Sequence, residues 1–188
     1  MRVISGKFKG RKLGSPADER VRPTTDRIKE TLFNILSSKN PDGYGLVLDL
    51  FGGSGAVGIE SISRGADKVI FIDRDPDSVK LIKDNLNHVG AKSEEYEVYN
   101  VDYEFALKKL RGKKFDFIFA DPPYALGLER KIAELIKKYD LLSDKGVLCV
   151  EHSSDKKVKF DGYDEDKREC GYTVLSFLTY KKEEQNEQ

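Results

Sequence analysis

Two short segments of this chain carry residue types that could do chemistry together. The first is a glycine-rich loop at residues 49–58, Asp-Leu-Phe-Gly-Gly-Ser-Gly-Ala-Val-Gly, and the second is the corner Asp121-Pro122-Pro123-Tyr124. Backbone N–H groups of such a loop can hold a small charged ligand. The corner offers a carboxylate, a backbone carbonyl and an aromatic ring to a planar amine. We therefore predict a site that methylates an exocyclic amino group of a nucleobase, with S-adenosylmethionine as the methyl donor.

The glycine loop alone fits two classes of ligand. Residues 53–58 match the dinucleotide pattern G-x-G-x-x-G, and Asp73 follows Gly53 by twenty residues. In a nicotinamide dehydrogenase this acid would bind a ribose, and in an S-adenosylmethionine site it would accept both ribose hydroxyls in the same way. The loop therefore leaves both cofactors open.

Three features favour S-adenosylmethionine over a nicotinamide cofactor. Asp49 would repel a pyrophosphate but attract the ammonium and sulfonium groups of the methyl donor. Asp102 follows a third predicted strand and could accept a hydrogen bond from the adenine amino group. Tyr163 and Lys167 have the Y-x-x-x-K spacing of a dehydrogenase pair, but they fall in a charged stretch away from the loop. The candidate donor-binding residues are Asp49, Phe51, Gly52, Ser54, Gly55, Asp73, Arg74 and Asp102.

The corner at residues 121–124 suits the methylation of an amine. A nucleobase amine is a poor nucleophile because its lone pair is delocalised into the ring, so an enzyme must orient it. Asp121 could accept one N–H and the Pro122 carbonyl the other, which would aim the lone pair at the methyl group. Pro122 and Pro123 would stiffen the turn, and Tyr124 could stack on the base and offset part of the cost of extracting it. We predict that these four residues are catalytic.

From residue 46 onwards, short apolar runs alternate with amphipathic stretches. Strands are expected at residues 46–50, 68–72, 95–99, 115–120 and 146–150, and helices at residues 55–64, 76–89, 102–110 and 127–140. This alternation predicts an α/β fold with a parallel, doubly wound sheet whose ligands bind at the carboxyl ends of the strands. Residues 166–170 and 172–180 are expected to be two strands joined tightly through Gly171, which must pair antiparallel at one edge.

The N-terminal segment differs in charge from the rest of the chain. Residues 1–30 contain nine basic and four acidic side chains, a net charge of +5, whereas the whole chain has 33 of each kind and no net charge. Any nucleic-acid contact must therefore be local, and this segment is the candidate surface for it; a solvated basic arm is the alternative. Residues 2–13 could form a short hairpin, and Thr24 or Thr25 could cap a helix that runs to about Ser38.

The remaining composition argues against several other classes of protein. Cys149 and Cys170 are the only two cysteines, too few for a disulfide framework or a zinc cluster, and neither His88 nor His152 has other metal ligands near it in the sequence. The first residues lack the apolar region of a signal peptide, and no apolar stretch is long enough to span a membrane. We expect a cytoplasmic monomer that binds no metal and no membrane.

With these residues in hand, the chain resembles the class I S-adenosylmethionine-dependent methyltransferases, and within them the RsmD family of 16S rRNA guanine-N2 methyltransferases. The Asp-Pro-Pro-Tyr corner is shared with adenine-N6 enzymes, so it indicates only amino-group chemistry. Residues 22–36, Arg-Pro-Thr-Thr-Asp-Arg-Ile-Lys-Glu-Thr-Leu-Phe-Asn-Ile-Leu, with residues 2–6 and 10–13 before them, are similar to the more specific N-terminal signature of that family. The match spans roughly residues 2–180.

The resemblance implies a Rossmann-like fold with seven strands in the order 3-2-1-4-5-7-6, mostly parallel with the last strand antiparallel, and a small N-terminal hairpin and helix extension. It also implies a single methyl transfer to N2 of one guanine in small-subunit RNA, within an assembled ribosomal particle. We expect the extension at residues 1–40, the methyltransferase domain at 41–180 and a polar tail at 181–188. The candidate RNA-binding residues are Lys7, Lys9, Arg11 and Lys12, with Arg22, Thr25 and Arg27 carried over from the family.

Other functions stay open from the sequence alone. The nearest is an adenine-N6 methyltransferase acting on DNA or RNA, because its acceptor amine needs the same corner. A non-catalytic RNA-binding assembly factor and a nicotinamide dehydrogenase are the others. Within the donor site, Asn100 lies close enough to Asp102 to compete for the adenine.

Overall fold

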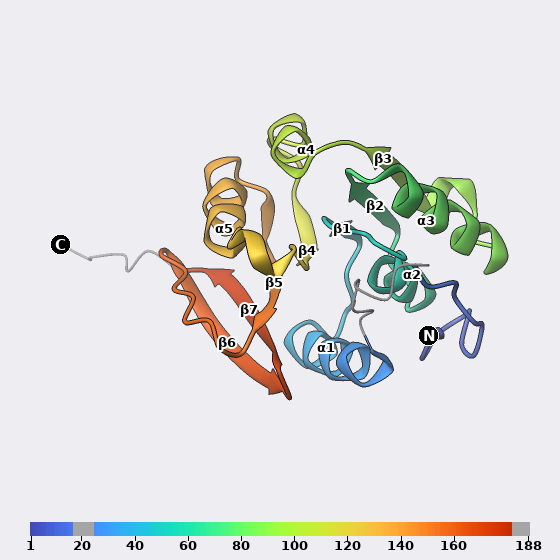
Figure 1. The fold of residues 1–188 in the computed structure, drawn as a ribbon, viewed down its shortest axis with the longest axis horizontal. Coiled ribbons are helices and arrows are strands. Elements are labelled where there is room, and N and C mark those ends of the chain that lie inside the picture. Colours follow the sequence, from blue (N-terminus) through green and yellow to red (C-terminus); the bar gives the residue numbers. More distant parts are fainter. Residues whose placement is uncertain (17–24, 182–188) are drawn as a thin grey trace.

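The computed structural model describes residues 1–16 and 25–181, and it shows one sheet with helices on both sides (Figure 1). The helices are α1 (Asp26–Lys39), α2 (Ala56–Ser63), α3 (Pro76–His88), α4 (Tyr103–Lys109) and α5 (Glu129–Lys138), with short 3₁₀ turns η1 (Ser93–Glu95) and η2 (Tyr124–Leu126). The strands are β1 (Leu46–Asp49), β2 (Lys68–Asp73), β3 (Tyr96–Asn100), β4 (Phe115–Ala120), β5 (Leu142–Ser153), β6 (Tyr163–Cys170) and β7 (Thr173–Tyr180).

The seven strands follow the order β3-β2-β1-β4-β5-β7-β6, which confirms the predicted topology. The first five strands pair in parallel, and β7 runs antiparallel to both β5 and β6. Gly171 has a φ of +67°, which the tight turn between β6 and β7 needs. Two strands begin earlier than expected: β5 because Leu142 pairs with Phe115 across a bulge, and β6 because Tyr163 pairs with Tyr180. The outer strand β6 carries six charged residues in succession, residues 164–169.

Two apolar layers hold the helices to the sheet. The layer on the α1 and α2 side contains Val47, Phe71 and Phe117, and the layer on the α4 and α5 side contains Leu48 and Ile118. Adjacent residues of one strand thus face opposite layers, as expected for strands that are buried on both faces. Among the described residues, no helix combines the length and the apolar character that crossing a bilayer requires.

Helix α1 forms where the sequence predicts it. The hydroxyl of Thr25 accepts a hydrogen bond from the N–H of Ile28 at 3.3 Å, so Thr25 is the N-cap, and Thr24 lies outside the described residues. The predicted apolar stripe is buried: Ile28, Leu32 and Leu36 pack in the same layer as the sheet residues. Buried side chains of α1 therefore attach the helix to the sheet, across the domain boundary proposed at residue 40.

Residues 1–16 form a loop that lies along α2 and α3 and closes as a minimal hairpin. One antiparallel bridge, between Arg2 and Lys12, closes it, and Val3 and Phe8 are buried. The tip hydrogen-bonds to the end of α2 instead of extending a ladder, since the N–H of Lys7 donates to the Ser63 carbonyl at 2.8 Å. The N–H of Val3 donates to the Arg11 carbonyl at 2.9 Å and the N–H of Leu13 to the Met1 carbonyl at 3.1 Å, so the two arms pair as a short antiparallel hairpin, as predicted, without forming strands of regular length.

A buried carboxylate on α2 fixes this N-terminal loop. Glu60 accepts hydrogen bonds from the N–H groups of Ile4 at 2.8 Å and Ser5 at 2.9 Å. Its carboxylate lies 3.6 Å from the ammonium of Lys29 on α1, and both side chains are fully buried. Burial lowers the pKa of Lys29, and the charge of Glu60 acts in the opposite direction. Glu60 thus joins three separate segments through one charged cluster.

Replacing Glu60 should therefore be costly for stability. Glu60→Ala leaves the buried Lys29 ammonium without its nearest carboxylate, and we expect the free energy of unfolding to fall by about 3 to 5 kcal/mol. Urea denaturation followed by circular dichroism would measure the change. The control is Lys80→Ala, which breaks the exposed Lys80–Asp84 pair and should leave the stability almost unchanged. Equal effects of the two substitutions would contradict a structural role for the buried cluster.

Candidate active site

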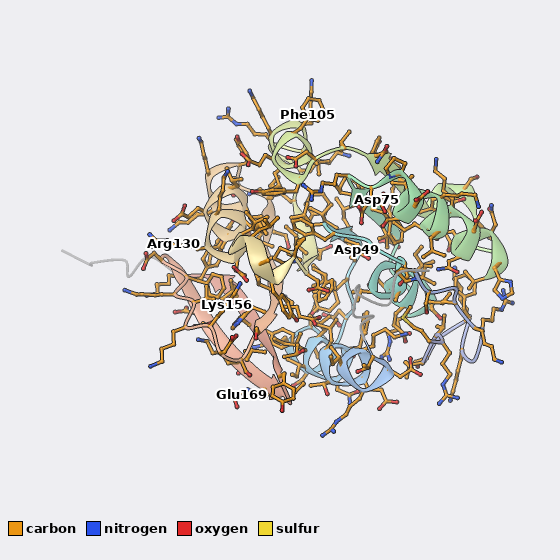
Figure 2. All side chains as sticks on the ribbon, viewed as in Figure 1. Asp49, Asp75, Phe105, Arg130, Lys156 and Glu169 are labelled. Atoms are coloured by element: carbon orange, nitrogen blue, oxygen red, sulfur yellow. The ribbon has the colours of Figure 1, made fainter. Side chains whose placement is uncertain are left out.

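A cavity of about 370 Å³ opens at the carboxyl ends of β1, β2 and β4, a size that suits a small-molecule ligand. Asp49 and Asp75, two of the residues that line it, are labelled in Figure 2. The predicted site residues in its wall are Asp49, Phe51, Gly52, Ser54, Asp73, Arg74, Asp102, Asp121 and Pro123. Gly55, Pro122 and Tyr124 are also described by the structure but do not form part of the wall. The cavity therefore joins most of the predicted donor site to part of the predicted acceptor corner.

The glycine loop is wound tightly against β1 and the start of α2. Gly55 is the N-cap of α2 with a φ of +76°, which favours glycine. At Gly58 a Cβ atom would lie 2.2 Å from the ring of Phe71, so only glycine allows α2 to approach the sheet this closely. The N–H of Gly58 donates to the Asp49 carboxylate at 3.0 Å. Asp49 thus fixes the turn from its own strand to the helix as well as lining the cavity.

Asp73 lies at the end of β2 and holds the loop from the other side. One carboxylate oxygen accepts the N–H of Gly53 at 2.9 Å, and the other accepts the N–H of Asp75 at 2.9 Å. Each oxygen of a carboxylate can accept more than one hydrogen bond. Asp73 is therefore fixed in orientation and still able to accept the two hydroxyls of a ribose.

Two residues at or just after the end of β3 could contact an adenine, and the structure places them differently. Asp102 lines the cavity and caps α4 by accepting the N–H of Glu104 at 2.8 Å. Asn100 does not line the cavity, and its side-chain amide donates to the Asp73 carbonyl at 3.1 Å. Asp102 is thus the better placed of the two. The rings of Phe51 and Tyr103 lie 5.4 Å apart beside it and add an apolar wall.

Asn85 is a buried residue of α3 that the sequence patterns did not single out. Its side-chain amide donates to the carbonyl of Ser54 in the glycine loop at 2.8 Å and to the carbonyl of Gly14 at 3.2 Å, and its oxygen accepts the N–H of Gly14 at 2.8 Å. Pro16, two residues after Gly14, lines the cavity. Asn85 therefore connects the N-terminal loop to the donor side of the site.

The acceptor corner is held by residues at and after the end of β5, which sequence reasoning also missed. The Tyr124 hydroxyl donates to Oε1 of Glu151 at 3.1 Å, and Glu151 is only 4% exposed. The Lys156 ammonium donates to the Tyr124 carbonyl and lies 2.9 Å from the Glu129 carboxylate. These contacts hold Tyr124 at both its ring and its backbone. The only sequence signal for Glu151 was an acid directly after an apolar strand.

Burial of carboxyl groups dominates the electrostatics of the site. Burial raises the pKa of Asp49 to about 7, although the Gly58 hydrogen bond opposes the shift, and the charge of Asp73 raises it further. Burial also raises the pKa of Asp121 well above its ordinary value, with added contributions from Glu151 and Asp49. A cationic ligand would relieve this crowding of negative charge. The methyl donor, with its ammonium and sulfonium groups, has the matching charge.

The structure does not bring the predicted basic residues of the N-terminal loop to the cavity. Lys7 pairs with Glu95, just before β3, and the Arg11 guanidinium donates to the Val89 carbonyl at the end of α3. Helix α3 begins at the cavity edge and is roughly 20 Å long, at 1.5 Å per residue. Lys7 and Arg11 therefore lie beside the amino ends of the strands, on the side opposite the cavity. Lys9 is in the same turn as Lys7.

The other predicted RNA-binding residues are placed differently. Lys12 lies beside Arg2 in the bridge that closes the loop, and Thr25 and Arg27 are at the start of α1. Arg22 lies outside the described residues. The assignment of all these residues to RNA binding stays a prediction.

The residues that suggested other chemistry have structural roles. Tyr163 is buried on β6 and donates its hydroxyl hydrogen to the Ala133 carbonyl at 2.8 Å, so it does not form a dehydrogenase pair beside the glycine loop. Among the residues that the structure describes, no group of three His, Cys, Asp or Glu side chains could hold a metal ion.

Comparisons with known proteins give a consistent result. The family described as Conserved hypothetical protein 95 matches residues 1–178. The chain is 41% identical to the YlbH protein of Bacillus subtilis, covering 81% of this chain and 82% of that protein. It is 37% identical to Ribosomal RNA small subunit methyltransferase D of Haemophilus influenzae, covering 83% and 80%. A solved structure of a Thermus thermophilus hypothetical protein has a TM-score of 0.82 at 27% identity, covering 95% of this chain and 98% of that one.

The affinity for S-adenosylmethionine should rise with pH through about 7. The ionised form of Asp49 attracts the cationic donor, and its pKa is about 7 without ligand. Calorimetry should show the Kd falling about fivefold between pH 6 and pH 7, a range in which an α-amino group such as the donor's stays mostly protonated. Asp49→Asn should bind more weakly and lose this pH dependence. A pH-independent Kd in the wild-type protein would remove Asp49 from donor binding.

The Tyr124–Glu151 contact should matter for transfer and not for donor binding. Tyr124→Phe removes the hydroxyl and should slow methyl transfer about fivefold, the effect of losing one hydrogen bond. Glu151→Ala should have a similar effect, while Glu151→Gln keeps an acceptor oxygen and should retain most of the activity. If the two residues act through this contact, the Tyr124→Phe, Glu151→Ala double variant is no slower than either single variant. Rates that multiply in the double variant would show independent roles.

Proposed function

Because the chain belongs to the family described as Conserved hypothetical protein 95, the RsmD/YlbH family of class I S-adenosylmethionine-dependent methyltransferases, we propose that it methylates the exocyclic N2 amino group of one guanine in small-subunit (16S) ribosomal RNA. A fully or partly assembled small subunit in the cytoplasm would be the substrate, and the enzyme would act as a monomer. Relatives named Ribosomal RNA small subunit methyltransferase D, including that of Escherichia coli at 37% identity, support the choice of RNA.

One observation supports amino-group methylation most strongly. The same cavity is lined by the acids at the ends of β1 and β2, by Asp102, and by Asp121 and Pro123 of the acceptor corner. A donor held by the first group would thus lie next to an amine held by the second. S-adenosylmethionine supplies an electrophilic methyl group when it is bound there. Its size and charge fit a cavity of about 370 Å³ rich in buried carboxylates.

The acceptor residues of this chain would orient the amine and receive its proton. Asp121 would accept one N–H of the base, and the Pro122 carbonyl the other. After transfer the nitrogen carries one proton too many, and Asp121 is a suitable acceptor because burial and neighbouring charges raise its pKa. Tyr124 would stack on the base, with its hydroxyl held by Glu151. The fixed carboxylates need little rearrangement when the substrate binds.

The identity of the methylated nucleoside tests this proposal directly. Small subunits that lack the modification would be incubated with the enzyme and labelled donor, and the RNA digested to nucleosides for mass spectrometry. We expect N2-methylguanosine at a single position. N6-methyladenosine would replace the guanine proposal with an adenine one, and no transfer at all would favour a non-catalytic RNA-binding role.

Two variants should separate donor binding from catalysis in the same assay. Asp121→Ala should abolish transfer but keep the donor Kd within several-fold of the wild-type value. Asp73→Ala should weaken donor binding by about 1.5 to 3 kcal/mol, because two hydroxyls lose their acceptor. Calorimetry on both variants measures the difference. Equal donor affinities would contradict this division of roles.

A further inference from the structure

Large apolar side chains of the described residues are exposed near the carboxyl ends of the strands, where the cavity opens. The four large ones are Tyr99, Phe105, Leu126 and Tyr172, with exposed fractions of 45%, 54%, 53% and 78%. Tyr99 is near the end of β3, Phe105 is in the first turn of α4, Leu126 is in η2 after β4, and Tyr172 is in the turn between β6 and β7. Each position belongs to the carboxyl ends of β1 to β5 or to the start of β7, which lies beside the end of β5. Scattered single residues of this kind are ordinary, so Tyr99 and Phe105, on the β3 and α4 side, need no further explanation. Leu126 and Tyr172 both lie beside the acceptor corner and are the candidate binding surface.

Leu126 and Tyr172 flank the acceptor corner from two sides. Leu126 lines the cavity two residues after Tyr124. The carbonyl of Tyr172 accepts the N–H of Ser154 at 2.9 Å, next to the end of β5. The neighbouring Thr173 pairs with Ser153 on β5, two residues after Glu151, which holds the Tyr124 hydroxyl. The exposed Tyr172 therefore belongs to a turn that lies beside the strand holding the predicted stacking ring.

We propose that Tyr172 and Leu126 form the surface on which unpaired bases next to the target guanine are held, an inference that rests on the proposed function. Extracting a base leaves its neighbours without a stacking partner, and contact with an aromatic ring returns about 1 to 3 kcal/mol per base. Every base has a flat face, so such a contact does not require a particular sequence. Tyr172 is available for it because its backbone, and not its ring, attaches the turn to the protein.

The basic residues of the N-terminal loop do not supply phosphate contacts beside Tyr172. The chain has no net charge. The basic side chains of Lys7 and Arg11 lie beside the amino ends of the strands, opposite the cavity, and contact Glu95 and the Val89 carbonyl. An exposed ring at the cavity mouth can hold a base without a phosphate contact. RNA recognised through unstacked bases is bound mainly in this way, on aromatic side chains.

Substitution of Tyr172 tests the proposal through the affinity for undermodified small subunits. Tyr172→Ala should raise the KM for subunits about 5- to 100-fold, leave the donor Kd unchanged, and leave the salt dependence of binding unchanged, because stacking releases no counterions. Tyr172→Phe keeps the ring and should stay within about twofold of the wild-type value. Phe105→Ala is the matched control, because this exposed ring projects from α4, away from Lys156 and Glu169 in Figure 2 and outside the proposed surface of Leu126 and Tyr172, and it should have no effect.

Crosslinking distinguishes RNA from a protein partner on the same surface. The photoreactive substitution Tyr172→p-benzoylphenylalanine should crosslink to RNA within a few nucleotides of the methylated guanine. A crosslink to a ribosomal protein, an unchanged KM for Tyr172→Ala, or an altered salt slope would each overturn the proposal. Its failure is separate from that of the proposed function, because the wild-type enzyme would still yield N2-methylguanosine in the nucleoside assay.

Discussion

The site depends on one constraint: β1, β4 and β5 are neighbours in the sheet, and each has at or near its carboxyl end a carboxylate that is largely removed from water. Asp49, Asp121 and Glu151 therefore concentrate negative charge in a small volume. Burial raises the pKa of Asp49 and of Asp121; the charge of Asp73 adds to the shift of Asp49, and the charges of Glu151 and Asp49 add to that of Asp121. Such an arrangement is unfavourable in an empty protein and favourable with a cationic ligand. The order of strands in the sheet thus determines which ligand charge the cavity accepts.

Much of the fold follows from local patterns that can be read in the sequence. Short apolar runs predicted the strands, and apolar stripes of helical period predicted the covering helices, because such periodicity involves only neighbouring residues. The short connection through Gly171 predicted the antiparallel pair, because it leaves no room for a crossover helix. Asp73 and the glycine loop were found for the same reason. Asp49, Asp73, Asp102 and Asp121 all follow strands, and parallel strands must end at the same edge. Their common cavity was therefore a consequence of topology.

The supporting residues were missed because their partners are distant in the sequence. Glu151 contacts a tyrosine 27 residues earlier, Glu60 binds backbone groups more than fifty residues earlier, and Asn85 binds a glycine 71 residues earlier. No local spacing marks such pairs. The position of Lys7 and Arg11 was not predictable either, since positive charge alone does not indicate which edge a loop reaches. Glu60 and Asn85 together make the first sixteen residues part of the framework of the donor site.

The charged outer strand β6 has a consequence for how this protein behaves at high concentration. An open sheet leaves unpaired backbone groups at its borders, where a strand from another molecule could add. A strand that paired with β6 would have to remove water from its consecutive carboxylate, ammonium and guanidinium groups. Edge-to-edge pairing of molecules at β6 is therefore disfavoured. The border formed by β3, with Tyr96 and Val98 and fewer charges, lacks this protection. Aggregation of destabilised variants would therefore begin at β3, and added lysines there would be the simplest remedy.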